Sequence, residues 1–218
     1  GNQGGNLYRA IRDIAPDDLD YRGPSPNAYT NTYSKTSNQS EDNWTDLIGL
    51  LRVLGSNDLF TASNLRQVAN LDQWMLHLAI MSLFDNRETG LNMGYNDDYS
   101  LYSGTADPRF ILVFYDLDTI LGEGSTAGTT NGSVFGCTAN NGSGATIGRL
   151  LAIPEFRQLY LRTLQRLIDT TFSAPHYDSL LQQTLGSYVP SAVLQRMTNW
   201  MNGRRAYVRS VVETNVLP

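Results

Sequence analysis

The sequence predicts an α+β fold that is mostly helical and contains one small β-hairpin. Helix-like apolar patterns occupy the chain from Thr45 to Phe84 and again from Pro154 onward. A pair of strand-like segments, DYSLY and RFILVFY, lies between them. The chain has 218 residues and neither an internal repeat nor a linker, so we expect a single domain over 1–218 with a substantial core.

The N-terminal part divides into a loop-rich segment, 1–44, and a core of regular elements, 45–122. Residues 1–44 are rich in Pro, Asn, Ser and Tyr and show no sustained period. Thr45 can cap a helix that ends at Gly55, and a shorter helix is expected over 57–69.

A central helix is predicted from Gln73 to Phe84, where the segment QWMLHLAIMSLF is apolar on every face. Trp74, Leu78, Met81 and Phe84 should therefore be almost fully buried, and His77 is expected to be a core histidine. The polar loop that leaves this helix is expected to place Asn86 and Glu88 close to the hairpin.

The hairpin itself is predicted from DYSLY and RFILVFY, which have the β-branched and aromatic character of strands and flank a turn. Residues 123–144 form a Gly/Ser-rich loop whose length is typical of functional or disordered segments. The tail, 145–218, is expected to be helical, with helices over 154–170 and 176–186 and a last one from Pro190.

Composition restricts the class of partner. The net charge of −5 argues against nucleic acid as a binding partner. The chain has no run of 18 apolar residues, so no membrane-spanning helix is predicted. Cys137 is the sole cysteine, so no intrachain disulfide forms. The neutral, Asn-rich surface favours an extracellular or cell-surface location, and the start without Met suggests a processed or truncated product.

Acidic residues are concentrated around the hairpin, which points to a metal site. Asp116 and Asp118 follow an apolar strand and should project to one side, where oxygen ligands suit Mg²⁺ or Ca²⁺. An Asp-rich turn without a metal is the simplest alternative. A phosphatase of the haloacid dehalogenase type is another, but Thr119 is one position too early for that motif and no Lys follows it.

An ordered set of segments resembles the spore-coat CotH kinase-like family from about Gly4 through Gly122. The resemblance implies the large lobe of a protein-kinase-like fold and transfer of phosphate from ATP to protein hydroxyls. It also implies Mg²⁺ or another divalent cation, with Mn²⁺ and Ca²⁺ as possibilities. The segments that carry it are GNLYRA, YSKTSN, DNWTDLIGLLRVL, NLDQWMLHLAIMSLFDNRETG, DDYSLY and DLDTILG.

The resemblance also implies roles for individual residues. Glu88 matches the catalytic carboxylate, although the family has Asp there, and Asp97 or Asp98 matches a metal-binding Asn. Asp116 and Asp118 match the Asp-x-Asp pair, in which Asp116 acts at the catalytic centre and chelates the metal.

The family's nucleotide-holding part, with its phosphate-contacting Lys, precedes the matched region. Catalysis is therefore expected to be incomplete in this chain, unless the Gly-rich loop covers the phosphates or the other lobe lies on another chain or fragment. Lys35 is the sole Lys and a candidate nucleotide contact. The partner is then a protein acceptor. The alternatives are a non-catalytic, self-assembling structural or coat-like module of the same ancestry, and a Ca²⁺-stabilised binding module.

Overall fold

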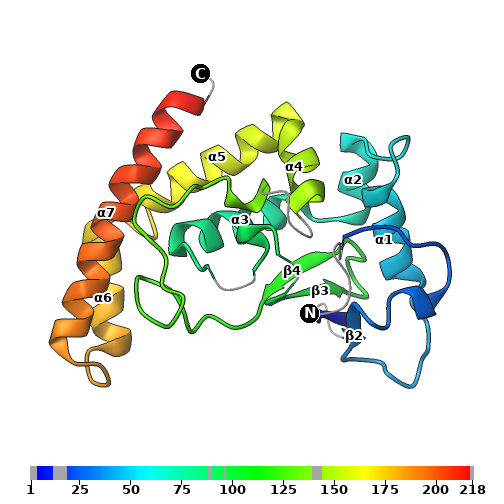
Figure 1. The fold of residues 1–218 in the computed structure, drawn as a ribbon, viewed down its shortest axis with the longest axis horizontal. Coiled ribbons are helices and arrows are strands. Elements are labelled where there is room, and N and C mark those ends of the chain that lie inside the picture. The colour runs from blue at the N-terminus through cyan, green and yellow to red at the C-terminus, as the bar shows by residue number, and fades with distance from the viewer. Residues whose placement is uncertain (1–3, 12–18, 88–89, 96, 139–143, 217–218) are drawn as a thin grey trace.

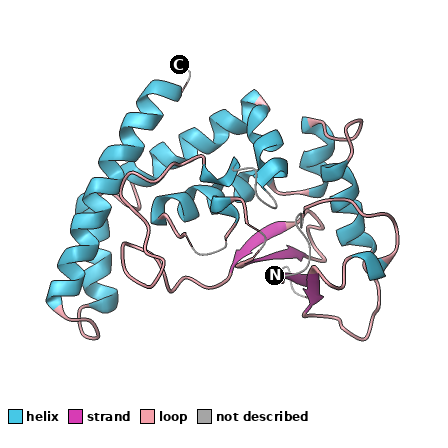
Figure 2. Ribbon diagram, in the orientation of Figure 1, coloured by secondary structure: helices cyan, strands magenta, loops and turns pink. Residues whose placement is uncertain are grey.

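A four-stranded antiparallel sheet with strand order β2-β1-β3-β4 lies beside a larger group of helices (Figures 1 and 2). The computed structural model describes residues 4–11, 19–87, 90–95, 97–138 and 144–216. This arrangement confirms the α+β, mostly helical class. The strands are β1 (Asn6–Ala10), β2 (Tyr33–Lys35), β3 (Tyr99–Ser103) and β4 (Ile111–Phe114).

Helices occupy most of the rest of the described chain. In Figure 1, α3 lies at the centre, α1 and α2 lie beyond the sheet, and α6 and α7 form the opposite end. The helices are α1 (Thr45–Gly55), α2 (Ala62–Val68), α3 (Leu71–Phe84), α4 (Gly144–Ala152), α5 (Pro154–Asp169), α6 (Ala174–Leu185) and α7 (Ser191–Asn215). Short 3₁₀ helices cover Pro26–Ala28, Leu91–Met93 and Gly136–Thr138.

The central position of α3 confirms the sequence prediction. Trp74 and Leu78 are fully buried, and the Trp74 indole donates to the Phe110 carbonyl over 2.9 Å. Asn70 caps the helix by accepting from the Gln73 amide. The prediction for Phe84 was wrong in degree, because this last helical residue is only half-buried and packs edge-to-face on Phe172.

The loop-rich prediction for 1–44 missed β1 and β2. These strands have only five and three residues, too few for a periodic pattern, and they acquire their backbone hydrogen bonds by pairing. Register partners Tyr8 and Leu101 join β1 to β3, and both side chains enter the core. One buried apolar cluster then extends from Tyr8 to Val212.

Helix starts also differ from the sequence predictions. The N-cap of α1 is Trp44, which makes no side-chain cap hydrogen bond, so Thr45 is the first helical residue and not the cap. The Asn43 side chain, just before the helix, accepts from the Thr45 amide over 3.0 Å. Helix α2 begins only after Thr61, whose hydroxyl accepts from Asn64. Helix α4 was not predicted separately, because its first residues share the Gly-rich composition of the preceding loop.

Candidate functional site

The pairing of β3 with β4 brings two acidic segments to one end of the hairpin. Tyr99, the first residue of β3, is the register partner of Phe114, the last residue of β4. Asp97 and Asp98 enter β3 at this end and Asp116 leaves β4 there. We call Asp97, Asp98, Asp116 and Asp118 the acidic end of the hairpin.

The backbone bends sharply at two of these aspartates. Asp98 has φ +58° and Asp116 has φ +49°, in the left-handed region that Asp tolerates better than most residues. Asp98 is buried, whereas Asp116 and Asp118 are exposed. Since β4 ends at Phe114 and Asp116 is left-handed, strand alternation does not determine where Asp116 and Asp118 point.

The acidic end offers the right donor chemistry for a hard cation, because carboxylate oxygens are the ligands that Mg²⁺ and Ca²⁺ prefer. No hydrogen bond from a described residue reaches the Asp116 carboxylate, which leaves its oxygens available. However, within the described part of the chain no three acidic, His or Cys side chains meet as a metal-binding group. Glu88 lies outside the described residues.

Asn86 connects the loop after α3 to the acidic end, as the sequence predicted. Its side chain is fully buried, donates from Nδ2 to the Asp116 carbonyl over 3.5 Å, and accepts at Oδ1 from the Thr119 hydroxyl over 3.3 Å. The Asn92 amide donates to the Asn86 carbonyl over 2.6 Å. The segment that leads to Glu88 is therefore tied to the backbone of the Asp116 turn.

Asp85 has a different role from the aspartates at the acidic end. It ends α3 with φ +44°, and its buried carboxylate accepts from the Thr129 amide over 2.6 Å and from Arg87 Nε over 3.1 Å. A Cβ at Gly128 or Gly132 would overlap this carboxylate. Asp85 therefore holds the Gly-rich loop, and only glycine allows so close an approach.

Two residues of α7 hold the same loop from the other side. Trp200 donates from its indole to the Gly128 carbonyl over 3.2 Å, and Arg204 donates to the carbonyls of Thr130 and Gly132. Burial lowers the pKa of Arg204, and the nearby Asp85 carboxylate opposes that shift. The described part of the loop is thus fastened between the end of α3 and α7.

Lys35 lies away from the acidic end. Lys35 on β2 is the register partner of Tyr8 on β1, Tyr8 pairs with Leu101 on β3, and Leu101 pairs with Leu112 on β4. Lys35 is therefore three strand spacings, about 14 Å, from β4. Its ammonium donates to the carbonyls of Glu41 and Asn43 over 2.9 and 2.8 Å.

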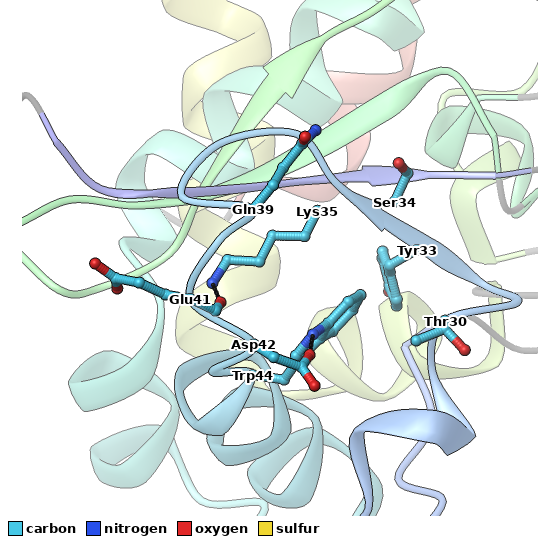
Figure 3. Close-up of a pocket in the computed structure, with 8 residues that line it drawn as sticks. All are labelled: Thr30, Tyr33, Ser34, Lys35, Gln39, Glu41, Asp42 and Trp44. Carbon is cyan, nitrogen blue, oxygen red and sulfur yellow. Dashed lines mark hydrogen bonds between the residues drawn. The ribbon is translucent and has the colours of Figure 1, made fainter.

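A pocket of about 320 Å³ surrounds the Lys35 side chain, and the aspartates of the acidic end are not among the residues that line it (Figure 3). The lining residues are Thr30, Tyr33, Ser34, Lys35, Gln39, Glu41, Asp42 and Trp44.

One cationic side chain near the acidic end, that of Arg9, was not predicted from the sequence. Arg9 on β1 places its guanidinium 3.7 Å from the ring centroid of Tyr115, the residue before Asp116. The segment GNLYRA had suggested a match but not a strand, so the neighbour of Arg9 could not be inferred.

These features define an α+β protein whose small antiparallel sheet carries an acidic end beside a largely helical body. A family model described as CotH kinase protein matches residues 1–208, and the chain therefore belongs to the CotH kinase family. Membership implies the use of ATP and a divalent cation in general terms. No curated protein gives a significant match. None of the helices in the described part of the chain combines the length and apolar character needed to cross a bilayer.

Proposed function

We propose that this chain is the large lobe of a kinase-like phosphotransferase that moves the terminal phosphoryl group of ATP to a protein hydroxyl. Family membership supports the reaction class. The observation that carries the assignment of the site is the Tyr99–Phe114 register, which brings both acidic segments to one end of the hairpin. Asn86 then ties the loop before Glu88 to the same place.

In this proposal Asp116 and Asp118, with Asp97 or Asp98, hold Mg²⁺ or a related divalent cation. A cation held there would supply positive charge that offsets the charge on the phosphate oxygens. Glu88 orients the acceptor hydroxyl and takes its proton as the oxygen attacks the terminal phosphorus. The bond to the bridging oxygen breaks, and ADP leaves with that electron pair.

We expect transfer by the 218-residue chain to be slow. Kinases also hold the phosphates with a Gly-rich cover and a Lys. In the described structure the Gly-rich loop is bound by Asp85 and α7, and the Lys35 ammonium is bound by two carbonyls. The contact between Lys35 and a nucleotide stays a prediction, and it requires a change in those hydrogen bonds.

Cation binding and phosphate transfer test the proposal together. Calorimetry with Mn²⁺ should show binding that Asp116→Asn removes and that Asp107→Asn, the same exchange near the other end of the hairpin, retains. Labelled ATP with Mn²⁺ should give weak labelling of a generic protein acceptor. Asp116→Asn should abolish this labelling and Asp107→Asn should retain it. Equal behaviour of the two variants in both assays would refute the assigned site.

A non-catalytic structural module of the same family is the second candidate. It is favoured by the lack of a preformed three-ligand group among the described side chains. An extracellular or cell-surface location, like that of the coat family the sequence resembles, suits both candidates. Absence of Mn²⁺ binding and of labelling in the parent chain, together with concentration-dependent self-assembly, would favour the structural module.

A further inference from the structure

We propose that Arg9 is the residue that contacts the phosphate oxygens of the nucleotide at the acidic end of the hairpin. The inference rests on the proposed function, since it names a further residue of the same site. It assigns to Arg9 the role of phosphate contact that the sequence had suggested for Lys35.

The sheet register places Arg9 on the same face of the sheet as Val113 and close to the acidic end of the hairpin. Arg9 pairs with Ser100, which pairs with Val113, so these three side chains share one face of the sheet. Two residues beyond Val113 on that face is Tyr115, whose ring lies under the Arg9 guanidinium. Asp116 follows directly.

Lys35 belongs to the opposite face. Its register partner is Tyr8, the neighbour of Arg9 on β1, and side chains of adjacent residues in a strand point to opposite faces. The Tyr8 side chain is fully buried and its hydroxyl donates to Asp46 on α1. The face that carries Lys35 is therefore the helix-covered face, whereas Arg9 lies on the other one.

The Arg9 guanidinium has donors without acceptors. Its Nε is buried and has no hydrogen-bond partner, and no ion pair to Arg9 occurs among the described residues. By contrast, Arg87, Arg109 and Arg196 each pair with a carboxylate. The terminal nitrogens of this half-buried side chain also make no hydrogen bond to a described residue, so they are the donors that an anionic ligand can reach.

The chemistry of the guanidinium selects a phosphate. Its planar fork of N–H groups matches two phosphate oxygens, and stacking on an aromatic ring holds the plane in place without consuming those donors. The acidic end carries four aspartates, whose negative charge would repel a polyphosphate that approached without a cation. The positive charge of Arg9, which contacts the residue before Asp116, offsets part of that repulsion.

The experiment uses tripolyphosphate in metal-free buffer and Mg·ATP as probes, with affinity measured by calorimetry. Arg9→Gln should weaken tripolyphosphate binding by about tenfold or more, the loss expected for hydrogen bonds to a charged group. Arg109→Gln makes the same charge change at the far end of the hairpin and should alter affinity by less than about twofold. Arg9→Lys, which keeps the charge without the fork, should fall between them.

Two further variants separate the possible failures. Tyr115→Leu removes the stacking surface but keeps Arg9, and it should weaken tripolyphosphate binding several-fold while the thermal melt shows a folded chain. Asp116→Asn should abolish Mn²⁺ binding and leave metal-free tripolyphosphate binding at least as tight as in the parent, because it removes a repelling charge. If Asp116→Asn kept Mn²⁺ binding while Arg9→Gln still weakened tripolyphosphate binding, the proposed function would be contradicted but the role of Arg9 would not.

Equal affinities of Arg9→Gln and Arg109→Gln for tripolyphosphate would overturn the inference. So would the absence of tripolyphosphate binding by the folded parent chain at millimolar concentration. A lower melting temperature of Arg9→Gln with unchanged affinity would show that Arg9 only supports the sheet, and would overturn it as well.

Discussion

The Asn86 side chain contacts the Asp116 turn twice, at the Asp116 carbonyl and through the hydroxyl of Thr119. This relationship joins the loop after α3 to the end of the hairpin without using any carboxylate. The loop that leads to Glu88 and the Asp116 turn are therefore joined independently of a bound cation.

We predict that Asn86→Ala destabilises the protein by about 1–3 kcal/mol, because it leaves the buried Thr119 hydroxyl and the Asp116 carbonyl without these partners. Urea unfolding measures the change. Asn199→Ala is the control, since Asn199 on α7 makes only an exposed contact with Gln195, and its effect should stay within about 0.5 kcal/mol. Similar values for both variants would contradict the assigned link.

Gly132→Ala should destabilise the chain by more than about 1 kcal/mol, because its Cβ would overlap the Asp85 carboxylate and push the loop away from α3. Gly49→Ala in α1 is the matched control. No atom lies within 4 Å of a Cβ at Gly49, so this change should be neutral or stabilise the helix by up to about 1 kcal/mol. The prediction is wrong if both variants unfold at the same urea concentration.

Leu78→Ala should cost roughly 2–5 kcal/mol, the usual range for removing a large buried side chain. Leu78 is fully buried in α3, whereas Leu180 in α6 is 46% exposed and serves as the control. Leu180→Ala should change the free energy of unfolding by about 0.5 kcal/mol or less. A loss below about 1 kcal/mol for Leu78→Ala would remove α3 from the centre of the core.

His77 should make stability depend on pH in the acid range. Burial lowers the pKa of His77 from 6.5 to about 3, and its ring stacks on Phe114 at 4.3 Å. Between these two values the unfolded chain binds a proton that the folded chain does not, so stability falls as pH falls, by up to about 1.4 kcal/mol per unit. Above pH 6.5 the contribution is constant.

Urea midpoints of the parent and of His77→Phe between pH 7 and 4 measure this effect. The variant keeps a ring against Phe114 but cannot bind a proton, so its midpoint should fall less steeply over the range. His176→Gln changes the other, exposed histidine and should keep the parent slope. Parallel curves for all three proteins would show that His77 titrates normally.

The sequence predicted α3, the hairpin and the helical tail because each has a long apolar pattern that packing reinforces. It did not predict β1 and β2, since strands of three to five residues depend on partners elsewhere in the chain. The same limit hid Arg9, which meets Tyr115 only through the sheet.

Within the candidate site, the sequence predicted the nearness of Asn86 to the hairpin but not the bends at the aspartates. It treated Asp116 and Asp118 as a continuation of the strand, whereas Asp116 has a left-handed backbone. Lys35 was selected as the sole lysine, and its bonds to two carbonyls could not be foreseen from composition.

The fastening of the Gly-rich loop has a consequence for the order in which the protein forms. Arg204 binds both that loop and the Ser82 carbonyl, a partner 122 positions earlier in the chain. During synthesis the N-terminal elements leave the ribosome long before α7, so the loop beside Asp85 lacks one of its two supports until late. Contacts this distant in sequence slow folding, and the surroundings of Asp85 should be among the last regions to gain protection from hydrogen exchange.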